Sequence, residues 1–156
     1  MDPSLTTREI TSADVPAIVR QRRLMFESMG YRDPARNDRM DLAAEAYLRE
    51  AVPRGEYRGW LVTTSAGEPV AGIGVVVLRR APTPYNLGGC SAYLLSLYVD
   101  PAYRRQGIAR HLVQTAVDWA HAQGIGQVSL HASDQGRRLY ESLGFQASNE
   151  MRLALP

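Results

Sequence analysis

The run Val99-Asp-Pro-Ala-Tyr-Arg-Arg-Gln-Gly-Ile-Ala109 carries the residue types that bind an anion. Apolar residues at 92–99 predict a buried strand before it, and the residues after it repeat at helical spacing, so the run predicts a strand-to-helix turn. Such a turn leaves amide N–H groups unpaired at the positive end of a helix dipole, with Arg104 and Arg105 beside them. Because Gly107 lets a ligand come close to the backbone, the predicted ligand is a phosphate or pyrophosphate.

These residues also resemble a family signature. Arg104-x-x-Gly107-x-Ala109 is similar to the Gln/Arg-x-x-Gly-x-Gly/Ala motif of the GCN5-related N-acetyltransferase (GNAT) superfamily, whose loop holds the pyrophosphate of acetyl-CoA. Residues 139–145, Leu-Tyr-Glu-Ser-Leu-Gly-Phe, resemble the second acetyl-CoA motif of that family. The resemblance implies an α/β domain with a mixed, mostly antiparallel sheet. A central parallel pair of strands would splay around the cofactor, and helices would cover both faces.

The resemblance further implies which residues contact acetyl-CoA. Main-chain groups of Leu97, Tyr98 and Val99 would meet the acetyl-pantetheine arm. The pyrophosphate would be wrapped by residues 104–109, which are Arg104, Arg105, Gln106, Gly107, Ile108 and Ala109. Asp134 stands where many relatives have an asparagine that bonds the pantetheine arm or the substrate, although an aspartate accepts and cannot donate. Arg137 either reaches a phosphate of CoA or belongs to a solvated helix face.

Tyr140 is the predicted catalytic residue. When an amine attacks a thioester, the leaving group is a thiolate, and a phenol aimed at the sulfur can donate a hydrogen bond or a proton to it. The alternative is a tyrosine that only packs its ring on the sheet. An acceptor ammonium must also lose a proton, yet the strand at 92–99 contains no acidic residue. Glu27, His131 and Asp134 remain as candidate bases, and the base stays unassigned.

Composition limits the other classes of function. The 156 residues predict a single domain spanning 1–156, and the formal charge of +2 comes without a basic tract, which argues against a nucleic-acid partner. The one cysteine, Cys90, excludes an internal disulfide, and the histidines show no metal-ligand spacing, so no metal is expected. The N-terminal residues lack the basic-then-apolar pattern that predicts a secretion signal, and the apolar run 73–78 is too short for a membrane span. The expected location is the cytoplasm, away from membranes.

Periodicity and turn residues predict the elements that position these groups. Strands are expected at 5–10, 60–64, 70–78, 92–99 and 127–131, with final strands at 145–147 and 151–155. Helices are expected at 15–29 with Asp14 as N-cap, at 42–51 after a polar loop at 31–39, from 108 to Gly124, and from 134 to 143. The pair 60–64 and 70–78 reads as an antiparallel hairpin, in which Gly72 and Gly74 mark a bulge or a crowded neighbour. The strand, helix and strand between 92 and 131 require a parallel crossover.

The sequence thus predicts an N-acetyltransferase that moves acetyl directly from acetyl-CoA to a primary amine of a small molecule or a protein N-terminus. A non-catalytic acyl-CoA-binding module is the alternative, supported by the acid-free strand at 92–99. A P-loop or Rossmann nucleotide enzyme fits less well, because the turn lacks the lysine of the former and the three-glycine spacing of the latter. The acceptor is not encoded in a readable motif, and a homodimer, common among proteins of this kind, is one expected assembly.

Overall fold

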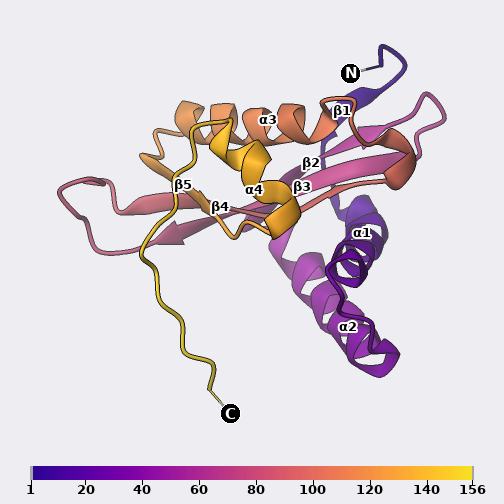
Figure 1. Ribbon diagram of the computed structural model, residues 1–156, viewed down its shortest axis with the longest axis horizontal. Helices are drawn as coiled ribbons and strands as arrows, with labels where there is room; N and C mark the ends of the chain where they lie inside the picture. Colours follow the sequence, from indigo (N-terminus) through magenta and orange to yellow (C-terminus); the bar gives the residue numbers. More distant parts are fainter. Residues whose placement is uncertain (1, 156) are drawn as a thin grey trace.

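The computed structural model describes residues 2–155. The protein folds around one five-stranded sheet (Figure 1). The strands lie in chain order and are β1 (Thr6–Glu9), β2 (Tyr57–Thr63), β3 (Pro69–Arg79), β4 (Cys90–Val99) and β5 (Gln127–Leu130). Each neighbouring pair from β1 to β4 is antiparallel, whereas β4 and β5 are parallel. The predicted mixed sheet, the antiparallel hairpin and the parallel crossover are therefore confirmed.

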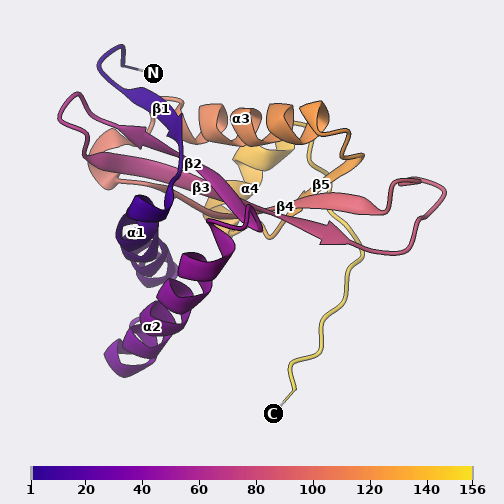
Figure 2. The ribbon, with the colours of Figure 1, turned by 180° about the vertical axis from the view of Figure 1, so that it is seen from behind.

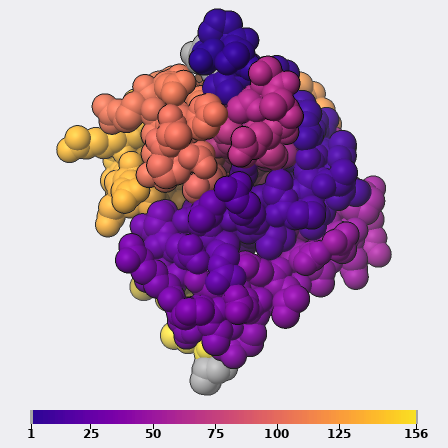
Figure 3. All heavy atoms as spheres, turned by 90° about the vertical axis from the view of Figure 1, so that its right-hand side faces the viewer, coloured from indigo at the N-terminus to yellow at the C-terminus, as the bar shows by residue number. Residues whose placement is uncertain are grey.

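Helices cover both faces of the sheet. On one face lie α1 (Val15–Ser28) and α2 (Pro34–Ala51), and on the other lie α3 (Ile108–Ala122) and α4 (Asp134–Glu141), as the front and back views show (Figures 1 and 2). Two short 3-10 turns, η1 (Ser12–Asp14) and η2 (Pro101–Tyr103), precede α1 and α3. Seen from the side, the turn that follows β4 lies above the first two helices (Figure 3).

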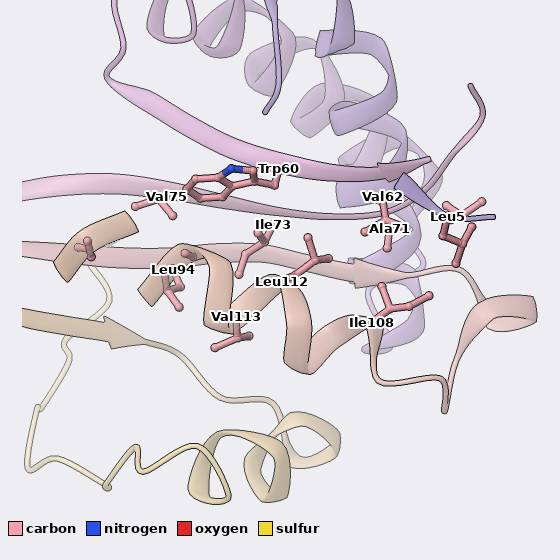
Figure 4. Packing of buried hydrophobic residues seen from close by; sticks show 14 residues of the cluster. Leu5, Trp60, Val62, Ala71, Ile73, Val75, Leu94, Ile108, Leu112 and Val113 are labelled. Carbon is pink, nitrogen blue, oxygen red and sulfur yellow. The ribbon is translucent and has the colours of Figure 1, made fainter. Parts of the chain in front are cut away.

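Each face of the sheet has its own apolar core. The larger core lies between α3 and the sheet, and Figure 4 shows Leu112 beside the strands. The buried residues of α3 are Ile108, Leu112, Val113, Ala116 and Ala120. The smaller core lies under α1 and α2 and contains Val15, Ile18, Leu48, Ala51 and Tyr57. Burial of these side chains holds α1 and α3 against opposite faces of the strands that carry the site.

The structure corrects two expectations near the N-terminus. The polar run expected to be a loop at 31–39 is mostly helical, because α2 begins at Pro34. Asp33 caps it by accepting from the Arg36 N–H, and a proline in the first turn lacks only an N–H that would be unpaired there. Asp14 stands at the N-cap position of α1, but its side chain turns back to Thr11 and Arg8 and does not cap that helix.

The strands expected at 145–147 and 151–155 are absent from the described residues, which are irregular from Phe145 to Leu155. Gly144, with φ of +89°, ends the last helix turn, and the Phe145 ring packs on the ring of Tyr140 instead of joining the sheet. The apolar residues that suggested a strand, Met151, Leu153 and Leu155, are exposed. These apolar residues alternate with polar ones as in a strand, but they do not form a buried face.

Candidate active site

The central feature of the site is a gap between the two parallel strands. β4 and β5 pair only over Ser91–Leu94 and Gln127–Leu130, while β4 continues to Val99. Beyond Leu94, the edge of β4 that faces β5 has no strand partner among residues 2–155, so its main-chain groups are free to pair with an extended ligand. A cleft of about 700 Å³ opens there, bounded by α1, β4, the turn after β4, the start of α3, the end of β5 and α4.

A β-bulge bends β4 where it borders the cleft. Gly72 pairs with Tyr98 and Gly74 with Leu95, so two residues of β4 oppose one residue of β3. One of the two, Ser96, has a left-handed φ of 58°, which is uncommon for a residue with a side chain. Its hydroxyl accepts a hydrogen bond of 2.5 Å from Arg22 Nη1 of α1. This contact ties the bulge to the first helix.

Both glycines that flank the bulge are needed for space. A Cβ on Gly72 would lie 2.5 Å from Gln21 Oε1 and 2.8 Å from Leu61 Cδ2, and one on Gly74 would overlap the Tyr57 hydroxyl. The sequence left open whether these glycines mark a bulge or a crowded neighbour. The structure shows both, since the register shift lies between them.

The turn between β4 and α3 presents unpaired donors to the cleft. Among residues 2–155, the backbone N–H groups of residues 105–110 donate no hydrogen bond to other main-chain atoms. Arg105 and Gly107 adopt left-handed φ values of 65° and 80°, a backbone conformation that occurs in anion-binding turns. The Arg104 Nε donates to the Val99 carbonyl at 3.0 Å and holds that side chain over the strand end. No atom lies within 4 Å of the Cβ position of Gly107, so this cradle fits an anion such as a pyrophosphate.

Tyr140 enters the cleft from α4. Ser133 caps this helix by accepting from the Gly136 N–H at 3.2 Å, and the ring of Tyr140 stacks edge-to-face on Phe145 at a centroid distance of 5.9 Å. Burial raises the pKa of the Tyr140 phenol above its usual value. The phenol therefore stays protonated throughout the neutral pH range, as a hydrogen-bond donor must.

Most of the residues singled out by sequence meet at this cleft. Those that line it are Leu97, Tyr98, Val99, Arg104, Arg105, Gly107, Ile108, Ala109 and Tyr140. Three others, Gln106, Asp134 and Arg137, are not among the lining residues. Asp134 is the first residue of α4, one position after the capping Ser133. Contact of any of these residues with a cofactor stays a prediction.

The candidate bases are distributed unevenly. Glu27 is outside the cleft lining and pairs with Arg23 Nε at 3.0 Å, whereas His131 lines the cleft. The His131 Nδ1 accepts a hydrogen bond from Arg152 Nη2 at 2.6 Å and also contacts the Tyr93 hydroxyl. A neutral imidazole has one acceptor nitrogen, so this arrangement places the ring proton on Nε2. Nε2 then carries the ring proton and has no lone pair that could accept a proton from the ammonium group of the acceptor.

The charge of the lining is one-sided. Its ionisable groups include Arg22, Arg104, Arg105, Arg110 and His131, and within residues 2–155 no Asp or Glu lines the cleft. The sequence did not single out Arg22, Ser96, Tyr93 or Gly136, because nothing in their spacing separates them from ordinary helix and strand positions. Their roles follow from the bulge and from the packing of α4.

Comparison with known proteins agrees with this geometry. The acetyltransferase (GNAT) family model matches residues 22–145, which include the turn after β4 and the whole of α4. The chain belongs to the GNAT family. The resemblance that the two motifs suggested is confirmed. A splayed parallel pair beside a loop of free N–H groups is the arrangement expected for such a protein.

Solved structures and curated relatives extend the comparison. The crystal structure of a GCN5-related N-acetyltransferase from Ralstonia eutropha JMP134 is 30% identical, with a TM-score of 0.90 over 97% of this chain and 98% of that one. A predicted acetyltransferase from Clostridium acetobutylicum, solved with acetyl-CoA, shares the fold at 23% identity, with a TM-score of 0.88 over 97% of this chain and 96% of that one. N-acetyltransferase 8 of Rattus norvegicus is 35% identical over 95 residues, which are 59% of this chain and 41% of that protein. This GNAT chain thus spans less than half of the curated relative.

None of the helices between residues 2 and 155 has the length and apolar character that crossing a bilayer requires. The same part of the chain holds no group of three or more His, Cys, Asp or Glu side chains arranged to bind a metal ion.

Proposed function

We propose that this GNAT protein transfers acetyl from acetyl-CoA directly to a primary amine of a small molecule or a protein N-terminus. The amine nitrogen attacks the thioester carbon, a C–N bond forms and the C–S bond breaks. The sulfur leaves as a thiolate, whose proton comes from Tyr140 or through it, and the proton lost by the amine goes to solvent. Cys90 does not line the cleft, and the direct route needs no covalent enzyme intermediate.

The observation that carries the proposal is the meeting of three features in one cleft. The free N–H groups of residues 105–110 suit the pyrophosphate, and the unpaired edge of β4 from Leu95 to Val99 suits the pantetheine amides. Tyr140 lines the same cleft. A nucleotide site would need only the first of these features. The three together support a long, bent thioester such as acetyl-CoA.

The raised pKa of Tyr140 defines how it acts. A free thiol has a pKa of about 8.5 and a tyrosine one of about 10, so complete proton transfer is uphill by about 2 kcal/mol before burial is considered. Burial raises the pKa of Tyr140 further and increases that cost. The phenol therefore works as a hydrogen-bond donor that stabilises the developing thiolate, and the proton moves late, after the C–S bond has broken.

No lining group is placed to take the proton of the acceptor. His131 is occupied at Nδ1, and carboxylates are absent from the cleft lining within the described chain. An alkylammonium with a pKa of about 10 is then deprotonated by water before attack. The basic side chains around the cleft assist, because neighbouring positive charge favours the neutral amine.

The test is release of free CoA from acetyl-CoA with a panel of primary amines, together with calorimetric titration of CoA. Acetyl transfer to one or more amines, and CoA binding, support the proposal. Tight CoA binding with no turnover on any acceptor, and no effect of Tyr140→Phe, would instead support the non-catalytic binding module. Absence of any heat on titration with CoA would contradict both.

A further inference from the structure

Two consecutive arginines of α1 have opposite surroundings. Arg23 binds three carboxylates, with Nε 3.0 Å from Glu27, and Nη1 2.6 Å from Asp38 and 2.8 Å from Asp41. Within residues 2–155, Arg22 has no carboxylate within 4.0 Å, although it is the next residue along the helix. Glu27, Asp38 and Asp41 are thus used by Arg23, and within the described residues the charge of Arg22 is left without a counter-ion.

Arg22 is held at the cleft by other contacts. Its Nη1 donates to Ser96 Oγ at 2.5 Å, and its guanidinium lies 5.6 Å from the centroid of the Phe26 ring. Its Nε is buried and has no hydrogen-bond partner among the described residues. Arg22 is half-buried, and a buried N–H donor without an acceptor beside an unpaired charge is costly unless a ligand completes it.

Within the described residues, no negatively charged side chain lines the cleft around Arg22. On the α1 side, the cleft is otherwise lined by Met25, Phe26, Ser28 and Met29, and no Asp or Glu of residues 2–155 lines any part of it. The other arginines of the lining belong to the turn after β4 and to the start of α3, at the anion cradle. Arg22 is therefore the cation on the side of the cleft that remains for the acceptor.

We infer that the acceptor is an amine that also carries an oxyanion, a carboxylate or a phosphate ester, and that Arg22 binds that group. A guanidinium matches the geometry of either anion through paired N–H groups. Polycationic amines are disfavoured, because the cleft offers them arginines and no carboxylates. This inference rests on the proposed function and names the class of its second substrate.

The experiment compares acceptors that differ in the presence of the anion. Phenylalanine is paired with phenylalaninamide, and phosphoethanolamine with ethanolamine. For each acceptor and the wild-type protein, kcat/KM is expressed per concentration of neutral amine, because the anion also changes the pKa of the amine. We expect the anionic member of at least one pair to be preferred by about tenfold or more, as for other sites with a dedicated charged partner. The pair that shows the preference identifies carboxylate or phosphate. Equal rates within both pairs, or a preference for the uncharged members, would overturn the inference.

Variants of α1 separate binding from structure. Arg22→Gln keeps an N–H donor for Ser96 but removes the charge, and it is expected to abolish the preference through KM while the affinity for CoA stays unchanged. Arg22→Lys keeps the charge and is expected to restore part of the preference. Arg20→Gln, an exposed position on the same helix outside the lining, is the matched control and is expected to keep all of it. A preference that survives Arg22→Gln would overturn the role of Arg22.

Calorimetry gives a readout that does not depend on turnover. With CoA bound, the preferred anionic acceptor is expected to bind the wild-type protein about tenfold more tightly than it binds Arg22→Gln. Acetylation of amines without any anion preference contradicts this inference and leaves the proposed function intact. Failure to acetylate any amine, with CoA bound normally, contradicts the proposed function itself.

Discussion

Gly136 lies directly against the ring of Tyr140 within α4. A Cβ added to Gly136 would stand 2.9 Å from Cε2 of that ring and 3.3 Å from Ser133 Oγ, the capping hydroxyl. A glycine inside a helix costs about 0.5–1 kcal/mol relative to alanine, so its presence here needs a reason. The reason is space for the tyrosine ring, which fixes where the phenol points in the cleft.

Gly136→Ala is therefore expected to lower kcat while leaving the fold intact. The added methyl pushes the Tyr140 ring aside, and a displaced phenol no longer meets the sulfur, which we expect to reduce kcat by about tenfold or more. Steady-state kinetics and thermal unfolding of the same variant check this. An unchanged kcat would show that the ring position does not matter to the reaction.

Tyr140→Phe removes the hydroxyl and keeps the ring that packs on Phe145. Loss of a group that acts only as the thiolate forms lowers kcat and leaves substrate binding unaltered, so we expect a drop of about 10²-fold with little change in KM for acetyl-CoA. Phe145→Leu, which alters the packing but keeps the phenol, is the control. Equal losses in both variants would assign Tyr140 to packing alone.

The pH profile follows from the absence of a free base and the raised pKa of the phenol. We expect kcat/KM to rise tenfold per pH unit until the acceptor amine is neutral, at a pKa set by the acceptor and of about 10 for an alkylamine. Because burial raises the pKa of Tyr140, no alkaline loss from its ionisation is expected below about pH 10. His131→Gln is expected to keep the same profile. A limb of the profile that this variant abolishes would instead identify His131 as the base.

The second half of the fold was predictable because its signals are local. We can predict α3 from its own apolar period and from Gly124, which follows it. The strands on either side are likewise predicted without knowledge of the rest of the chain. The start of α2 was missed for a physical reason. Arg36, Asn37, Asp38 and Arg39 have no apolar face of their own, and their helix forms because Asp33 caps it and because Arg23 of α1 binds Asp38 and Asp41.

The site was predictable only where a motif marks it. Main-chain donors near Gly107 and the phenol of Tyr140 follow from short patterns, whereas Arg22 and Ser96 meet across 74 positions of sequence through a bulge. No periodicity encodes such a bulge, since Gly72 and Gly74 are explained equally well by crowding alone. The prediction of C-terminal strands was wrong for a different reason. Met151, Leu153 and Leu155 alternate with polar residues as in a strand, but no strand of the described chain pairs with them.

Gly107→Ala tests the anion cradle. The position has φ of 80° and open space around it, so the substitution costs the fold only the strain of a left-handed alanine, about 1–2 kcal/mol. Its methyl, however, would stand where the pyrophosphate approaches, and we expect CoA affinity to fall by about tenfold or more. Gly124→Ala is the matched control, because Gly124 has φ of 68° and equally open space at the other end of α3. Equal CoA affinity for the two variants would remove the cradle from cofactor binding.

Asp14 links β1 to the start of α1 and makes the stability of the fold depend on pH. Hydrogen bonds from Arg8, at 2.7 and 2.8 Å, and from the Thr11 N–H lower the Asp14 pKa to about 2. Because the unfolded value is about 3.9, this carboxylate stabilises the fold above pH 4, and the contribution is lost as the pH falls from about 4 to about 2. Arg8 is 41% exposed, so we expect Asp14→Asn to cost about 1–2 kcal/mol at pH 7, less than the full shift implies. Urea unfolding of the wild type and of Asp14→Asn checks this, with Glu68→Gln, an exposed acid that forms no ion pair within the described residues, as control. A stability difference that stays constant from pH 7 to pH 3 would contradict the role of the Asp14 charge.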